Sequence, residues 1–264
     1  MCTIGAVKNQ TTGNRVFFKT VDQTFVRLYP EPFITQGSKY RYVKMPSNTD
    51  PKEDGVLAGV NEAGVVVLGA DGNTLPNYVG TRFGSLNESL VVYEKILEEC
   101  GTVREALDFV INEYQNRYMG GNGDIVMIGD RTEVIALEYL PDRWGLEFQR
   151  DKPYLVRSNF FVLMDRLRPA PEECTLHTSS AIRYADALRH LSIKGKNNDL
   201  DDVFGLVKSH YQGKNAMSIC RHGGEGEYFT HACFVVELQP SSIEAYISIN
   251  GNPCEKAFTK ISLI

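Results

Sequence analysis

The chain has 264 residues, 42% of them hydrophobic and 23% charged, a globular composition that argues against a disordered, collagen-like or coiled-coil chain. Its 28 basic and 33 acidic side chains give a formal charge of −5, and the basic residues form no block, so we expect no nucleic-acid partner. No stretch approaches the roughly 20 apolar residues that span a bilayer, and the N-terminus does not read as a signal peptide. We therefore expect no membrane insertion and a cytoplasmic location.

Two β-hairpins are predicted near the start of the chain, because strand-forming residues flank short turns that contain glycine and asparagine. Their strands cover residues 2–9, 15–21, 55–60 and 64–69. Two helices follow, since apolar residues recur at helical spacing from Leu86 to Cys100 and again from Ala106 to Tyr114. Each helix is preceded by a capping-box sequence, at Ser85 in the first case and at Thr102 in the second.

Strands and helices continue through the second half of the chain. The predicted strands cover residues 125–128, 133–139, 154–157, 229–238 and 244–249. Ser179 or Ser180 is expected to cap one helix, and Asp199 a shorter helix that reaches Tyr211. Successive strands joined by short turns indicate antiparallel sheets, and hence an α+β fold. No linker is long enough to separate domains, so we expect a single domain over residues 1–264.

Cys2 differs from the other five cysteines because of its position. The six cysteines contain no CxxC pair, which argues against a zinc ribbon or a thioredoxin motif. Five of them are predicted to be small core residues. Cys2 follows Met1, which is removed from a new chain when the second residue is small, so we expect Cys2 to begin the mature chain. One residue then supplies a thiol nucleophile and an α-amine base.

The residues after Cys2 resemble the start of the N-terminal nucleophile (Ntn) amide hydrolases. These include the choloylglycine hydrolase and penicillin V acylase family, acid-ceramidase-like amidases, and the acyl-CoA:6-aminopenicillanic acid acyltransferases. The matching hairpin contains Gly13-Asn14 and then Lys19-Thr20-Val21-Asp22. The resemblance implies that Asp22 orients the α-amine and that Lys19 stabilises the thiolate. It also implies a four-layer αββα sandwich, with two antiparallel sheets between helix layers.

Two further segments follow in the order found in these families. Residues 59–65 (GVNEAGV) resemble a conserved hairpin, and a polar residue soon after it, Asp71 or Asn73, is implied as a second oxyanion donor. An aspartate departs from the usual asparagine, because a carboxylate donates only when it is protonated. Residues 156–160 (VRSNF) resemble the segment that supplies the oxyanion-hole asparagine. This implies Asn159 as the donor, with Phe160 beside the substrate.

Segments nearer the C-terminus resemble the acyltransferase branch. They are residues 179–184 (SSAIRY), 218–222 (SICRH) and 251–254 (GNPC). Arg183 or Arg221 is implied as the arginine near the nucleophile. We assign Arg183 to catalysis and Arg221 to substrate binding, although the sequence does not choose between them.

The resemblance implies that Cys2 cleaves a linear amide of a small acylated substrate through a thioester, or passes the acyl group to a second amine. A dipeptidase of the same superfamily and an inactive homologue that binds a small acyl ligand remain alternatives. No cofactor is expected. No metal site is expected either, because His222 and His231 form a possible pair without a visible third ligand. Several of the resembled enzymes are tetramers, so a dimer or tetramer is possible.

Overall fold

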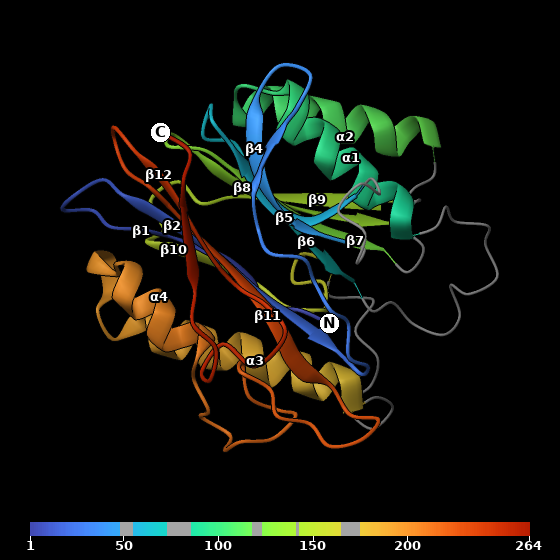
Figure 1. Cartoon of the computed structure of the whole chain (residues 1–264), viewed down its shortest axis with the longest axis vertical. Coiled ribbons are helices and arrows are strands. Elements are labelled where there is room, and N and C mark those ends of the chain that lie inside the picture. The colour runs from blue at the N-terminus through green and yellow to red at the C-terminus, as the bar shows by residue number, and fades with distance from the viewer. Residues whose placement is uncertain (48–54, 73–85, 118–122, 141–142, 165–174) are drawn as a thin grey trace.

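The computed structural model describes residues 1–47, 55–72, 86–117, 123–140, 143–164 and 175–264. Two antiparallel sheets lie face to face, and a pair of helices covers the outer face of each sheet (Figure 1). This order of layers confirms the predicted α+β fold and its αββα arrangement. None of the helices within the described ranges is long and apolar enough to cross a membrane.

The strands nearest to both chain ends lie in one sheet. Its order is β10 (Tyr154–Arg157), β1 (Ile4–Lys8), β2 (Arg15–Gln23), β11 (Phe229–Leu238), β12 (Ile243–Ser248) and β13 (Thr259–Ser262). The other sheet runs β3 (Ile34–Gln36), β4 (Arg41–Pro46), β5 (Val56–Asn61), β6 (Val66–Asp71), β7 (Asp124–Gly129), β8 (Val134–Leu140) and β9 (Arg143–Phe148). Helices α3 (Thr175–Ser192) and α4 (Leu200–Val207) pack on the first sheet, and α1 (Leu86–Glu99) and α2 (Val103–Arg117) on the second. A short 3₁₀ helix, η3 (Gly195–Asn197), lies between α3 and α4.

The alternation of side chains along β2 assigns its residues to two different cores. Phe17 and Val21 belong to the core between the sheets, whereas Val16 and Phe18 belong to the core under α3 and α4. Because successive strand residues point to opposite faces, Lys19 shares the face of Phe17 and Val21. Its side chain therefore points toward the opposite sheet.

The β5–β6 hairpin is held to α1 through its turn. Gly64 has a φ of 93°, a conformation that glycine adopts without strain. The side-chain oxygen of Asn61 accepts the N–H of Val65 at 2.9 Å, and its amide nitrogen donates to the carbonyls of Leu97 and Cys100 at 3.0 and 2.8 Å. These bonds fix the hairpin, and β6 carries Gly69 and Asp71 to the edge of the site.

The start of α3 differs from the prediction. The helix begins at Thr175, so Ser179 and Ser180 lie inside it and do not cap it. The hydroxyl of Ser180 instead accepts a hydrogen bond from the side chain of Arg183, at 3.1 Å. Ser85, the predicted cap of the helix from Leu86, lies outside the described residues.

The remaining helix predictions hold, with one boundary changed. Thr102 Oγ1 accepts the N–H of Glu105 at 3.2 Å as the cap of α2. The reciprocal bond is absent from this cap, because Glu105 accepts from Gly101 instead. Asp199 caps α4 through a capping box with Asp202, but α4 ends at Val207 and does not reach Tyr211.

The strands β3, β4, β9 and β13 were not predicted. Three of them are short or lie at sheet edges, where the burial pattern is partly or largely exposed. In β4 the apolar run is interrupted by Lys44, which is nevertheless buried because it pairs with Glu94. Edge exposure and a buried ion pair both remove the hydrophobic periodicity on which strand prediction depends.

Candidate functional site

Cys2 lies two residues before the start of β1 and is 8% exposed. Its backbone nitrogen, a peptide nitrogen while Met1 is attached, donates to Asn159 Oδ1 at 2.6 Å. The next residue is fixed to β2, because the N–H of Thr3 donates to Thr20 Oγ1 and the N–H of Thr20 donates to the Thr3 carbonyl, both at 2.9 Å. The bond to Asn159 on one side and the bonds to Thr20 on the other fix the backbone of Cys2 and Thr3, and therefore the position of the thiol.

Lys19 brings its charge directly to the thiol. Its Nζ lies 3.0 Å from Cys2 Sγ and also donates to the carbonyl of Gly69 on β6. The side chain is 1% exposed, so water does not screen this contact effectively. An ammonium group in this position favours the thiolate, which is the reactive form of cysteine.

Asp22, at the end of β2, is shared by two arginines. Its Oδ1 accepts from Thr230 Oγ1 at 2.9 Å. Its Oδ2 lies 3.5 Å from Arg183 Nη1 and 3.5 Å from Arg221 Nη1, and it accepts no hydrogen bond from the residues that the structure describes. The structure thus brings both candidate arginines to the same carboxylate.

Arg183 connects α3 with the start of β1. Its Nη1 donates to the Cys2 carbonyl at 2.7 Å and to Thr3 Oγ1 at 2.8 Å, and its Nη2 donates to Asn159 Oδ1 at 3.2 Å. Burial lowers the pKa of Arg183 to about 10, and the charge of Asp22 opposes this shift. Arg183 therefore stays charged at neutral pH and holds the residues around the nucleophile.

Of the predicted oxyanion and substrate residues, the structure brings Asn159 and Asp71 together and places Phe160 away from the cleft. Asn159 Nδ2 uses one hydrogen to donate to the Asp71 carbonyl at 3.0 Å, which leaves its second amide hydrogen for another acceptor. Asp71 itself lines the cleft described next, and Asn73 lies outside the described residues. Phe160 is 7% exposed and stacks edge-on against Tyr184 at 5.3 Å, and it is not among the described residues that line the cleft.

A cleft of about 290 Å³ opens beside Cys2 and Asp22. This is near the lower end of the usual size range for small-molecule sites. Its polar lining includes Arg27 and Asp71, and its apolar lining comes from Met1, Val21, Phe25, Leu57, Leu90 and Tyr228. The arrangement suits a small ligand that has both an apolar and a polar part.

Thr230 is a site residue that the sequence did not reveal. It lies opposite Asp22 in the register of β11 and β2, just before the bulge at His231. Only the pairing of these two strands, which are distant in the chain, brings the hydroxyl to the carboxylate. His231, the possible partner of His222 in a metal site, instead contacts the carbonyl of Arg27 through its Nε2.

The groups that could hold a metal ion lie elsewhere. Within the described residues, one cluster offers at least three metal-ligating side chains: His210, Cys220, His222 and Cys254. The cleft residues do not belong to it. Its arrangement is taken up below.

No protein-family model matches the sequence, and no curated protein matches it. Solved structures do match. Penicillin V acylase from Agrobacterium tumefaciens is similar with a TM-score of 0.58 and 12% identity, over 99% of this chain and 86% of that one. A mutant of the conjugated bile acid hydrolase from Clostridium perfringens is similar with a TM-score of 0.54 and 15% identity, over 99% and 96%.

A third similar structure is the Caenorhabditis elegans orthologue of N-acylethanolamine-hydrolyzing acid amidase. It has a TM-score of 0.54 and 12% identity, over 89% of this chain and 92% of that one. All three are Ntn hydrolases, which confirms the fold that the N-terminal motifs predicted. At these identities the likeness establishes the fold alone.

Proposed function

We propose that this chain is a cysteine Ntn hydrolase that cleaves a linear amide of a small acylated substrate through a thioester on Cys2. The observation that carries the proposal is the 3.0 Å contact between Lys19 Nζ and Cys2 Sγ, with the thiol beside a cleft. Burying an ammonium is costly unless it meets strongly polar or charged partners, and the carbonyl of Gly69 is a neutral one. A thiolate on Cys2 would supply the charged partner.

The base in this mechanism is the α-amine of Cys2, which becomes available when Met1 is removed. The N-terminal amine of Met1 donates to the backbone carbonyl of Asp22 at 2.7 Å, so the start of the chain already lies against this residue. Asp22 Oδ2 is buried without a hydrogen bond, and a buried acceptor left in this state is destabilising. An N–H of the Cys2 α-amine would supply the missing donor, and the position of the amine would then be fixed by Asp22.

Bond making and breaking follow from these positions. The amine takes the thiol proton, and Sγ attacks the substrate carbonyl carbon to form an S–C bond. The resulting oxyanion accepts from the free amide hydrogen of Asn159 and from a backbone N–H, each such donor being worth about 3 kcal/mol. The Cys2 ammonium then protonates the leaving nitrogen as the C–N bond breaks. Water, or a second amine in the case of acyl transfer, attacks the thioester and regenerates the thiol.

The lining of the cleft indicates how a substrate would be oriented. Val21, Leu57 and Leu90 offer an apolar surface for the acyl part, and the loop after β2 adds Phe25, which is 54% exposed. Arg27 lies at the same cleft and could pair with an anionic group of the substrate. We therefore propose a short or medium acyl group on an amine that carries a polar or charged substituent.

The test combines intact-mass spectrometry, thiol labelling and a substrate panel. We expect the purified chain to lack Met1, and iodoacetamide to label Cys2 much faster than Cys100, because burial raises the pKa of Cys100 to about 11. N-acyl amino acids, penicillin V, conjugated bile salts and dipeptides would then be compared as substrates. Cys2→Ser should abolish turnover, and Cys100→Ser should not. Retained Met1, or equal labelling of the two thiols, would rule out the proposed nucleophile.

A further inference from the structure

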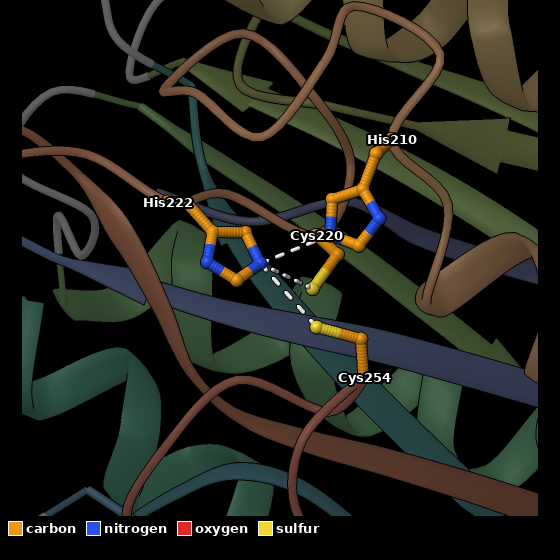
Figure 2. Close-up of side chains that lie close together, drawn as sticks. All are labelled: His210, Cys220, His222 and Cys254. Atoms are coloured by element: carbon orange, nitrogen blue, oxygen red, sulfur yellow. Dashed lines mark hydrogen bonds between the residues drawn. The ribbon is translucent and has the colours of Figure 1, made fainter.

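His210, Cys220, His222 and Cys254 converge at a place that the proposed reaction does not use (Figure 2). They come from the segment after α4, from the approach to β11, and from the turn after β12. One possible ligand atom from each residue lies within 4.8 Å of all the others. An ion pair also joins two of these segments, since Lys214 Nζ lies 3.4 Å from Glu255 Oε1, but both of its side chains are exposed.

Hydrogen bonding does not explain this convergence. His222 Nε2 lies 2.9 Å from His210 Nε2, 3.7 Å from Cys220 Sγ and 3.3 Å from Cys254 Sγ (Figure 2). A ring nitrogen of histidine carries either one hydrogen or one lone pair, so it can make one good hydrogen bond. Three neighbours around one nitrogen leave at least two of the contacts without such a bond. A cation placed between the four atoms would bind all of them at once.

We propose that these four side chains bind one zinc ion as a closed Cys₂His₂ site. Zinc prefers four nitrogen and sulfur ligands in tetrahedral geometry, with bonds of about 2.3 Å to sulfur and about 2.0–2.1 Å to nitrogen. The ligand atoms of such a site lie roughly 3.3–3.8 Å apart, so the contacts of His222 agree within about half an ångström. Small rotations of the side chains would complete the tetrahedron.

The surroundings also suit a bound zinc ion. Two thiolates and two neutral imidazoles give a divalent cation a net charge of zero, which lowers the cost of a partly buried site. The Nδ1 of His222 faces the carboxylate of Glu255 at 4.0 Å. Histidine ligands commonly direct their second nitrogen toward a carboxylate, which orients the ring. Because four protein ligands fill the coordination sphere, the ion is assigned a structural role.

The position of the cluster suggests what the ion stabilises. Cys220 and His222 flank Arg221 in the sequence, and Arg221 Nη1 reaches Asp22 at 3.5 Å. The side chain of Asn252, two residues before Cys254, donates to the carbonyl of Arg221. A zinc ion would therefore link the C-terminal turn to the segment that carries Arg221. Metal binding itself does not depend on the proposed amidase activity.

The test measures the metal content of the full chain, purified with a reducing agent and without chelators. We expect about one zinc per chain by inductively coupled plasma mass spectrometry. Replacing zinc with Co²⁺ should give the visible absorption of tetrahedral cobalt bound to thiolates. His210→Ala and Cys254→Ala should each lower the bound zinc at least tenfold. Cys100→Ala, which removes a buried thiol outside the cluster, should leave it unchanged.

Measurements on the unaltered chain keep the proposal falsifiable even if the ligand variants do not fold. The proposal is overturned if the reduced wild-type chain, incubated with zinc chloride and desalted, retains far less than one zinc per chain. A disulfide between Cys220 and Cys254 in the native chain would overturn it as well. So would a cobalt spectrum that is the same in the wild-type chain and in Cys254→Ala.

Discussion

Replacing Lys19 with methionine removes the cation at the thiol and keeps a side chain of similar length in the core. We expect Lys19→Met to remove the positive charge that stabilises negative charge on Cys2 Sγ. The rate at which iodoacetamide modifies Cys2 should therefore fall, because the negatively charged sulfur is the nucleophile.

The magnitude follows from the distance between the charges. At 3.0 Å and an effective dielectric constant of about 20, an ammonium and a thiolate attract each other by about 5.5 kcal/mol. Lys19 is buried whether Cys2 is a thiol or a thiolate. The free-energy cost of burying Lys19 is therefore the same in both states and does not change the difference between them. Water entering the site and relaxation of Arg183 would recover part of the loss. We therefore expect the substitution to remove at least about 2.7 kcal/mol of stabilisation of the negatively charged sulfur, which corresponds to a hundredfold slower alkylation.

The assay is the second-order rate of alkylation at neutral pH, followed by mass spectrometry of the N-terminal peptide. Lys44→Met is the matched control, because Lys44 is also a buried strand lysine but pairs with Glu94. It should lower stability, since Glu94 loses its cation, and leave the rate at Cys2 unchanged. An unchanged rate in a folded Lys19→Met chain would refute the reasoning from the 3.0 Å contact.

Three further changes test the site and the fold. Asn159→Ala should lower turnover at least about a hundredfold, and normal turnover would remove this residue from the oxyanion role. Glu138→Ala removes the 2.7 Å acceptor of Arg157 Nε and the acceptor of the Val162 and Leu163 N–H groups, while Glu147 still pairs with Arg157. It should cost about 3–5 kcal/mol in urea denaturation, whereas Glu62→Ala, in an exposed ion pair, should cost under about 1 kcal/mol. Burial raises the pKa of Asp124, so its contribution to stability is complete below the unfolded pKa of about 3.9 and is lost as pH rises through the folded value. Asp124→Asn should therefore gain stability relative to the wild type from about pH 4 upward, and a difference independent of pH would contradict this.

The central part of the fold could be predicted because its strands are buried and continuous. The strand at Phe229–Leu238 was predicted with both ends correct, since its apolar run is long and bounded by polar residues. Prediction failed where exposure or ion pairing hides the apolar pattern, as at Arg143–Phe148 and at Lys44. The start of α3 was placed too late, because serines that cap helices in many proteins here lie within the helix.

The candidate site was partly predictable for a similar reason. Cys2, Lys19 and Asp22 lie close together in the sequence, and a single hairpin brings them together in space. Thr230 and the Cys₂His₂ cluster depend on pairing between distant segments, which no local pattern contains. The nearest local signal for the cluster is the sequence Cys220-Arg221-His222, in which a cysteine and a histidine lie two residues apart.

The balance of charges around Cys2 has a consequence for the end of the reaction. Lys19, Arg183 and Arg221 each lie within 3.5 Å of Cys2 or Asp22, and Asp22 neutralises one of them. For an enzyme of the proposed class, the carboxylate product keeps the negative charge that the oxyanion carried, whereas the amine product does not. We therefore expect the acid to inhibit the enzyme more strongly than the amine in product-inhibition kinetics, and added salt to weaken that inhibition.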